Sequence, residues 1–177
     1  MKVCDITTYY FNDDGTIPNN DELPVLVYHQ VLAHCPKEIE YIFNTHNWRN
    51  SWINGVFDYH HYHSNVHEVL GVISGTSTIQ LGGERGERIE VSRGDVFVLP
   101  AGTGHKRLHA TSDFRVVGAY PNGMNYNIKT GEPTERPEVL QEIKQVMMPS
   151  TDPVYGSEGP LINYWSRNGT ITRCFTK

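Results

Sequence analysis

One stretch of the chain decides its fold: Gly55-Val-Phe-Asp-Tyr-His-His-Tyr-His-Ser-Asn-Val-His-Glu68. Side chains alternate between the two faces of a strand, so His61 and His63 point the same way and lie roughly 7 Å apart along the backbone. His60 and Tyr62 then point outward. Two imidazoles at this spacing can converge on one ion, and the stretch therefore predicts a metal site.

A carboxylate follows the two histidines at a useful distance. Residues 64–67 contain polar side chains suited to a turn, after which Glu68 would face inward on an antiparallel return strand, beside the imidazoles. The residues of 69–73 are apolar on both faces of that strand, so a slip of one residue would bring His67 inward instead. Periodicity leaves this alternative open.

The stretch Gly94–His109 adds a second group of polar residues. Counting by twos from His105 places Arg107 and His109 on one inward face, provided that the strand has no bulge. Arg107 would suit capture of a carboxylate or phosphate, although it could also pair with a structural Glu or point to solvent. His109 could act as a general acid or base, add a ligand, or be a satisfied core histidine.

Aromatic residues surround the histidines. Tyr59 shares the face of His61 and His63, so its hydroxyl could orient a substrate or donate a proton, and aromatic packing is the alternative. Trp48, Trp52 and Phe57 are assigned to packing.

Between residues 56 and 120 the chain alternates short apolar or β-branched runs with glycines, which indicates an all-β antiparallel barrel or sandwich. The expected strands are Thr76–Leu81, Arg88–Val91, Val96–Leu99 and Phe114–Ala119. The glycine-rich residues 82–86 could resemble a phosphate loop. A hairpin is favoured, because another strand rather than a helix follows them.

Flanking segments complete one domain spanning residues 1–177, with a core barrel at about 55–120. Residues 1–22 are expected to form an arm laid over the domain, and Leu23–Leu32 a strand. A short helix is expected from Pro36 to about Phe43. Glu135–Met147 reads as an amphipathic helix with Val139, Leu140, Ile143, Val146 and Met147 on one face, and Leu161–Trp165 as a returning strand.

Composition limits the partners. The net charge is −5 and no cluster of Lys and Arg exists, which argues against a nucleic-acid surface. The start of the chain lacks an apolar signal region, and no segment approaches the roughly 20 apolar residues that span a membrane, so a cytoplasmic location is expected. The cysteines, at positions 4, 35 and 174, form no close-spaced pair and are read as reduced thiols.

Both stretches resemble the cupin superfamily. Residues 55–75 match its first motif, G-x5-H-x-H-x4-E-x6-G, at every fixed position. Residues 94–109 match the second, G-x5-P-x-G-x2-H-x3-N, except that His109 stands where the family usually has Asn. Further segments, at residues 25–28, 58–63 and 152–156, resemble the YjlB-type small bacterial cupins. The resemblance implies a double-stranded β-helix, or jelly-roll barrel, with a few peripheral helices.

The resemblance also implies a ligand set, in which His61, His63, Glu68 and His105 hold one divalent transition metal. Mixed nitrogen and oxygen ligands without thiolate suit Fe(II), Mn(II), Ni(II), Co(II) or Zn(II). Small cupins often pair through edge strands, so a homodimer is expected.

Three functions stay open, because cupins include several kinds of protein. The favoured one is a metal-dependent enzyme with dioxygenase or isomerase-like chemistry that acts on a small metabolite, which would be anionic if Arg107 binds it. The second is a non-catalytic module that binds or senses a small molecule. The third is a scaffold in which the metal only stabilises the fold.

Overall fold

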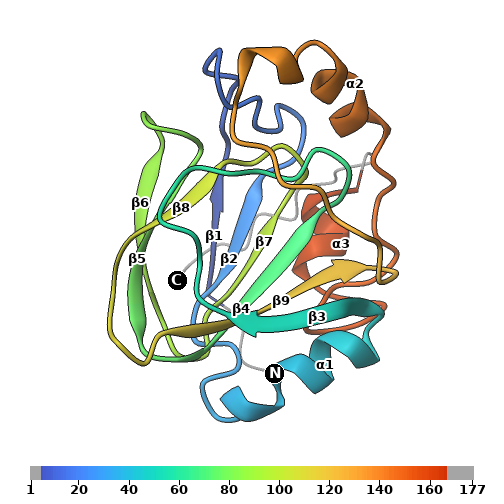
Figure 1. Cartoon of the computed structure of the whole chain (residues 1–177). Helices are drawn as coiled ribbons and strands as arrows, with labels where there is room; N and C mark the ends of the chain where they lie inside the picture. Colours follow the sequence, from blue (N-terminus) through green and yellow to red (C-terminus); the bar gives the residue numbers. More distant parts are fainter. Residues whose placement is uncertain (1–4, 167–177) are drawn as a thin grey trace, which may run out of the picture.

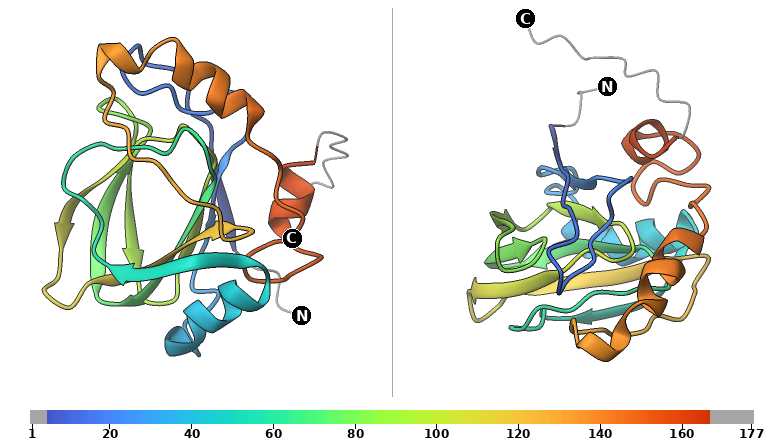
Figure 2. Two further views of the ribbon diagram at one scale, coloured as in Figure 1. Left: turned by 45° about the vertical axis from the view of Figure 1, so that its right-hand side comes forward. Right: turned by 90° about the horizontal axis from the view of Figure 1, so that it is seen from above.

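The computed structural model describes residues 5–166, which form two antiparallel sheets that face each other (Figures 1 and 2). The larger sheet has the strand order β1-β2-β7-β4-β9-β3, and the smaller has the order β6-β5-β8. The strands are β1 (Ile6–Tyr9), β2 (Val25–Tyr28), β3 (Trp48–Asn54), β4 (Glu68–Ser74), β5 (Thr76–Leu81), β6 (Glu87–Ser92), β7 (Val96–Leu99), β8 (His105–Ala110) and β9 (Arg115–Pro121). The predicted all-β class is confirmed.

The four strands predicted within the barrel region are all present, as β5, β6, β7 and β9. The glycine-rich segment after Leu81 joins β5 to β6 as a hairpin, as predicted, with Leu81 opposite Glu87. Gly75 turns the chain between β4 and β5 with φ +70°, and a Cβ there would lie 2.7 Å from the backbone nitrogen of Phe114. Glycine is therefore required at this corner of the barrel.

Apolar side chains fill the space between the sheets, where each buried Leu, Ile or Phe contributes roughly 1.5–3 kcal/mol. This core includes Val25, Val27, Leu70, Val72, Ile79, Leu81, Phe97, Leu99 and Val116. A second core lies on the outer face of the larger sheet, under two helices, and includes Phe43, Trp48, Val69, Val96, Val98 and Trp165. Because both faces of β4 are buried, its sequence shows no clean alternation.

The helices cover the larger sheet and one end of the barrel (Figures 1 and 2). They are the 3₁₀ turn η1 (Pro36–Glu38), α1 (Ile39–Thr45), the 3₁₀ turn η2 (Pro133–Glu135), α2 (Glu138–Gln145) and α3 (Pro160–Tyr164). The helix predicted from Pro36 is confirmed as η1 and α1. The second predicted helix is shorter than expected, because the backbone becomes extended at Val146, and Met147 is 69% exposed rather than packed.

The strand predicted at Leu161–Trp165 is wrong, since this segment belongs to α3 and its C-cap. Pro160 occupies the first turn, where its fixed φ favours a helix. The Asp152 side chain accepts a hydrogen bond from the Leu161 N–H, and Leu161 and Trp165, four residues apart, both pack in the outer core. A short apolar run fits a buried strand or a buried helix equally well.

The N-terminal arm is more regular than expected, because it contributes the edge strand β1, paired with β2. It then passes beside α2 at the end of the barrel (Figure 1), where both Asp13 carboxylate oxygens accept hydrogen bonds from Arg136. Among residues 5–166, no helix has the length and apolar character needed to cross a bilayer. Cys35 is a free thiol, and Cys4 and Cys174 lie outside the described residues.

Candidate metal centre

The predicted histidine strand is present only as a short bridged segment. His61 and His105 exchange backbone hydrogen bonds of 3.2 and 3.0 Å, while Tyr62 exchanges two of 2.9 Å with Lys129 on its other side. The His63 carbonyl accepts the N–H of Gly102 at 2.8 Å. These bonds hold the segment between β8 and the chain that follows β9, so both histidines face His105.

Three histidines and one carboxylate converge. Single nitrogen atoms of His61, His63 and His105 all lie within 4.8 Å of one another, and all three side chains are buried. Glu68 begins β4, and its Oε2 lies 3.2 Å from His63 Nε2 and 3.3 Å from His105 Nε2. The four residues predicted from the sequence therefore lie together in the structure, and the three histidines form a cluster that could hold a metal ion.

Each imidazole is oriented by a backbone carbonyl. His61 Nδ1 contacts the Tyr59 oxygen at 3.2 Å, His105 Nδ1 contacts the Thr103 oxygen at 3.0 Å, and His63 Nδ1 contacts the Asn127 oxygen. A carbonyl can only accept, so the proton lies on Nδ1, and a neutral ring keeps a lone pair on Nε2. Such anchoring of the far nitrogen is typical of metal-binding histidines.

Glu68 is held on one side and unsatisfied on the other. Its Oε1 accepts a hydrogen bond from the Tyr120 hydroxyl at 2.8 Å, and that hydroxyl accepts one from Trp52 Nε1 at 2.8 Å. Its Oε2, by contrast, is buried without a hydrogen bond from any described residue. A carboxylate oxygen that faces imidazole lone pairs needs a positive charge between them, and a divalent cation fits this donor set.

The pKa values in the cluster agree with that need. Burial, aided by the neighbouring His105, lowers the pKa of His61 to about 3. Burial also acts to lower the pKa of His63, but the negative charge of the neighbouring Glu68 carboxylate, together with the Asn127 carbonyl at Nδ1, outweighs it and raises that pKa. Burial alone would raise the pKa of Glu68, yet His63 and His105 hold it well below its usual range. The carboxylate is therefore ionised and attracts either a proton onto His63 or a cation.

The competing ligand His67 faces the other way. Its Nδ1 accepts the N–H of Ala101 at 2.9 Å, and its ring lies 4.8 Å from that of Trp165 in the outer core. The alternative left open by the sequence is thus resolved in favour of Glu68. Tyr62 also faces away from the cluster, although it is buried under α2 rather than exposed, and donates a 2.6 Å hydrogen bond to Glu135.

Tyr59 and Phe57 lie beside His61. The Tyr59 ring centroid is 5.8 Å from that of His61, while Phe57 stacks on Tyr59 at 5.0 Å. Both are 45% exposed, so Phe57 packs against Tyr59 and His61 at the surface and is not part of the core. The segment leaves the sheet after Asn54 and crosses the surface as a loop, where alternation no longer tells which side chains are buried.

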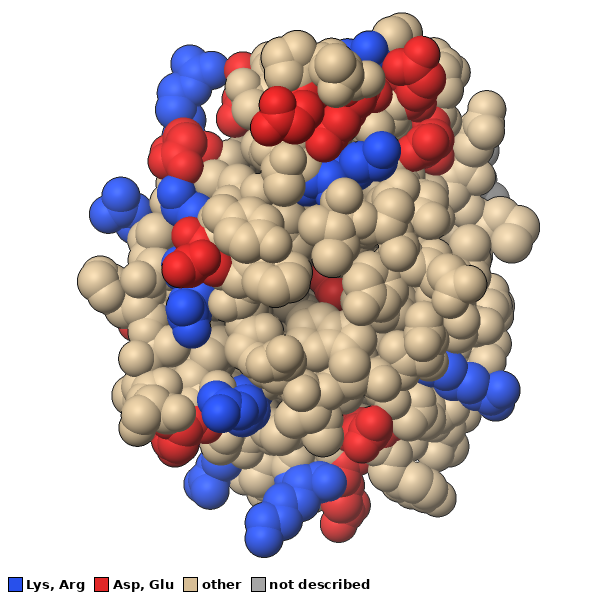
Figure 3. Space-filling view, in the orientation of Figure 1, with Lys and Arg blue, Asp and Glu red and all other residues tan. Residues whose placement is uncertain are grey.

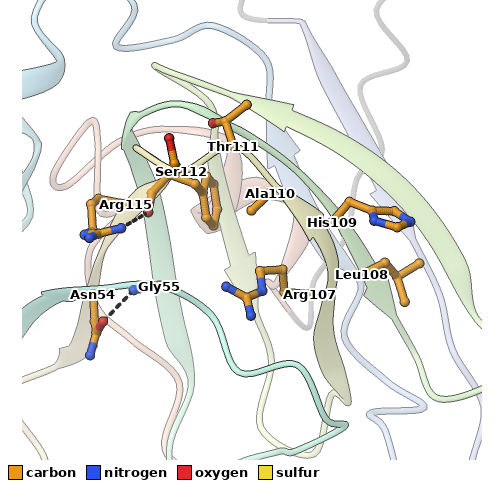
Figure 4. Close-up of a pocket in the computed structure, with 10 residues that line it drawn as sticks. Asn54, Gly55, Arg107, Leu108, His109, Ala110, Thr111, Ser112 and Arg115 are labelled. Carbon is orange, nitrogen blue, oxygen red and sulfur yellow. Dashed lines mark hydrogen bonds between the residues drawn. The ribbon is translucent and has the colours of Figure 1, made fainter.

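Arg107 and His109 do not share a face. Ile79 pairs with Arg107 and Thr78 with His109, so β8 carries an extra residue, Leu108, between them. Figure 4 shows the two side chains pointing in different directions, and His109 is exposed. This bulge contradicts the shared inward face, and the role of His109 stays a prediction that its position does not support.

Arg107 remains on the inward side of β8. It lines a hollow of about 490 Å³ together with Asn54 and Arg115 (Figure 4), and none of the four clustered residues lines that hollow. Its guanidinium forms no hydrogen bond or ion pair with another described residue. The Arg107 guanidinium is thus free to bind a ligand from outside the chain.

The sequence missed the residues that position the cluster. Tyr120 lies opposite Glu68 only because β9 pairs with β4, as Val69 opposite Ala119 shows, and this long-range pairing is not encoded by a local motif. Alternation along β9 would have pointed to Tyr120 once that pairing was known. No pattern in the sequence indicates the contact of the Asn127 carbonyl with His63, because any residue offers the same backbone atom.

Replacing Tyr120 by phenylalanine should weaken metal binding by roughly 10–100-fold, since it removes the hydrogen bond that orients Glu68 while keeping the ring. Competition with a chromogenic chelator measures this change. Tyr28→Phe, which removes a buried hydroxyl bonded to Asp152, is the matched control and should leave the affinity unchanged. Equal affinities for Tyr120→Phe and the wild type would contradict the assigned role.

Comparison with known proteins supports the fold and family. A cupin domain family model matches residues 54–117. The uncharacterized protein YjlB of Bacillus subtilis (strain 168) is 48% identical over 158 residues, covering 89% of this chain and 95% of that protein.

Two solved structures of other proteins are similar to this chain. Procruciferin, an 11S globulin from Brassica napus, is 21% identical with a TM-score of 0.36, over 80% of this chain and 33% of its own. Acireductone dioxygenase from Bacillus anthracis, with cadmium in its active centre, is 19% identical with a TM-score of 0.35, over 71% of this chain and 79% of its own. The identity to YjlB across nearly the whole chain, together with the domain match, shows that this protein belongs to the cupin superfamily, among the YjlB-type small cupins.

Proposed function

We propose that this protein is a metal-dependent enzyme acting on a small organic molecule, with His61, His63, Glu68 and His105 as ligands of one divalent transition metal. The observation that carries the proposal is the convergence of three anchored imidazoles on a buried, unsatisfied carboxylate oxygen. Burying such a group costs free energy unless a partner compensates it. Four protein ligands leave further coordination positions for a substrate.

The surrounding residues prepare this site for chemistry. Leu81 and Leu99 lie opposite His105 and Glu68 in the sheets and are buried, so the floor of the centre excludes water. Tyr120 fixes the carboxylate, and the three carbonyl contacts fix the imidazoles. A bound divalent ion would polarise a substrate oxygen, and a redox-active ion would also supply electron transfer.

The reaction class is proposed as dioxygenase or isomerase-like. Tag-free protein should be loaded separately with each of Fe(II), Mn(II), Co(II), Ni(II) and Zn(II) and mixed with organic and sugar acids. Oxygen consumption dependent on Fe(II) would support a dioxygenase, whereas redox-neutral conversion with another metal would support isomerisation. Tight ligand binding without turnover by any loaded form would contradict an enzyme and favour a binding or sensing module.

We propose that Arg107 binds an anionic part of the ligand. His105 and Arg107 share the inward face of β8 before the bulge, roughly 7 Å apart, and the guanidinium has no partner among the described residues. A dicarboxylate could therefore chelate the metal with one end and reach Arg107 with the other. Tyr59, beside His61, is proposed to orient the ligand or donate a proton.

This role predicts a preference that Arg107→Gln should remove. The metal-loaded wild type should bind 2-oxoglutarate about tenfold more tightly than 2-oxovalerate, which lacks the distal carboxylate, because a charge-assisted hydrogen bond contributes roughly 1.5–3 kcal/mol. Calorimetric titration measures both ligands. Arg88→Gln, on the exposed part of β6, should keep the preference. Retention of the preference in Arg107→Gln would contradict the role.

The assembly and location are also proposals. We propose a homodimer, formed through an edge strand such as β3, which ends the larger sheet and exposes Ile53. Light scattering should give twice the mass of one chain. A cytoplasmic location is proposed and can be checked by cell fractionation.

A further inference from the structure

Exposed aromatic rings stand on two segments beside the histidine cluster. Phe57 and Tyr59 are each 45% exposed, and Tyr126 is 39% exposed, with Met124 and Ile128 also exposed on the same segment. Single exposed apolar residues are ordinary, but a group of them around a buried polar centre indicates a binding surface.

The first pair of rings forms a wall next to His61. Phe57 and Tyr59 stack with a centroid distance of 5.0 Å and an interplanar angle of 16°. Phe57 also meets the His61 ring edge-on at 5.0 Å. We call this pair the first wall. Its position is fixed from below, because the Phe57 carbonyl accepts the N–H of Arg107 at 2.8 Å.

The second wall is Tyr126, which lies next to His63. Its ring meets that of His63 edge-on at 5.3 Å and stacks on Tyr120 at 4.5 Å. Tyr120 in turn donates to Glu68, so the second wall is packed against the residue that positions the carboxylate. The His61 and His63 rings are 5.9 Å apart, and each wall contacts a different one of them.

The surface between the two segments is open. In the space-filling view, charged side chains lie mostly towards the rim of this face, and a small hollow near its centre has acidic atoms at its floor (Figure 3). Figure 1 has the same orientation as Figure 3, and in it the segment of residues 55–67 and the segment that follows β9 cross this part of the face. A ligand entering here would pass between aromatic side chains before it reached the acidic floor.

We propose that the two walls bind the planar, apolar body of the substrate, which is an aromatic compound carrying adjacent oxygen donors for the metal. This inference rests on the proposed metal centre and adds the substrate class to it. A planar ring can stack on Phe57 or Tyr126 while its oxygen atoms reach the metal that the three histidines would hold. An aliphatic chain of similar polarity would lose that stacking.

Two hydroxamates test the inference, because they share one chelating group and differ only in the body attached to it. Zn(II)-loaded protein should bind benzohydroxamate at least tenfold more tightly than acetohydroxamate in calorimetric titrations, after correction for their affinities for free Zn(II). Phe57→Ala and Tyr126→Ala should each reduce the ratio severalfold without loss of bound zinc. Tyr41→Ala, which removes an exposed ring from α1, should keep the wild-type ratio.

The outcomes separate the inference from the proposed function. Equal affinity for the two hydroxamates in zinc-loaded wild type overturns the aromatic substrate class and leaves the metal centre standing. Failure of the wild type to hold any of the five divalent ions overturns the proposed function itself. If Phe57→Ala dissociates a dimer while the hydroxamate ratio stays unchanged, the first wall is a subunit contact and the inference is overturned. The wild-type comparison decides even if a wall variant fails to fold.

Discussion

The His105→Ala variant is expected to purify almost free of metal, while the wild type carries close to one ion per chain. The histidine supplies one of three clustered nitrogens and also lies 3.3 Å from Glu68, so its removal deletes a ligand and a neighbour of the carboxylate. Removing a residue that hydrogen-bonds a metal ligand typically costs 10–100-fold in affinity, and loss of a ligand itself should cost more than about 100-fold. Inductively coupled plasma mass spectrometry measures the bound metal.

The matched control for this experiment is His109→Ala. This histidine lies on the same strand, but beyond the bulge and exposed, so its variant should retain the metal content of the wild type. His61→Ala should behave like His105→Ala. Equal metal content in His105→Ala and wild type would show that the metal binds elsewhere, and loss in both His105→Ala and His109→Ala would point to a general effect on β8.

Removing the metal with a chelator should lower the melting temperature by about 10 °C. A ligand present at 1,000 times its dissociation constant stabilises the native state by about 4 kcal/mol, and in a chain of this length each kcal/mol shifts the melting temperature by roughly 2–4 °C. Differential scanning calorimetry of the metal-free and reloaded protein measures the difference. The double variant His61→Ala with His105→Ala should show no response to either treatment.

The difference in melting temperature between the metal-bound and the metal-free protein should become smaller as the pH falls from 8 to 6. The pKa of His63 is raised by Glu68, so in the metal-free protein this group contributes stability that is fully present below pH 6.5 and lost as the pH rises through its raised pKa. The metal-bound protein cannot take up that proton, and acidification therefore favours the metal-free form. His61, with a pKa of about 3, does not compete in this range. A difference that grows on acidification would contradict the assigned ligands.

The sequence predicted the centre better than its surroundings, for identifiable reasons. Only residues 64–67 separate His63 from Glu68, so alternation and a short loop suffice to bring these two side chains and His61 together. The predicted antiparallel pairing of the two segments is wrong, because β4 pairs with β7 and β9, and the histidine segment is bridged to His105 and Lys129. His105 required the family motif, because its bridge to His61 joins residues far apart in the chain. Tyr120 and the Asn127 carbonyl depend on strand pairing and loop backbone, which no local pattern encodes.

The same distinction explains the errors elsewhere. The strands β5 and β7 were predicted with their observed bounds, because β-branched runs between glycines have few alternatives. The bulge at Leu108 breaks strict alternation without leaving a mark in composition, and it turned His109 away from the face of Arg107. The strand predicted for the α3 segment was wrong because five mostly apolar residues fit a strand or a helix. Only the packing of Leu161 and Trp165 decides between the two.

An anomalous difference map from crystals of the metal-loaded protein, collected at the absorption edge of the bound metal, tests the central claim most directly. The ligand assignment predicts one strong peak within coordinating distance of the Nε2 atoms of His61, His63 and His105 and of Glu68 Oε2. A fully loaded protein whose peak lies away from these atoms, or a protein that shows no peak after incubation with any of the five divalent ions, would contradict it.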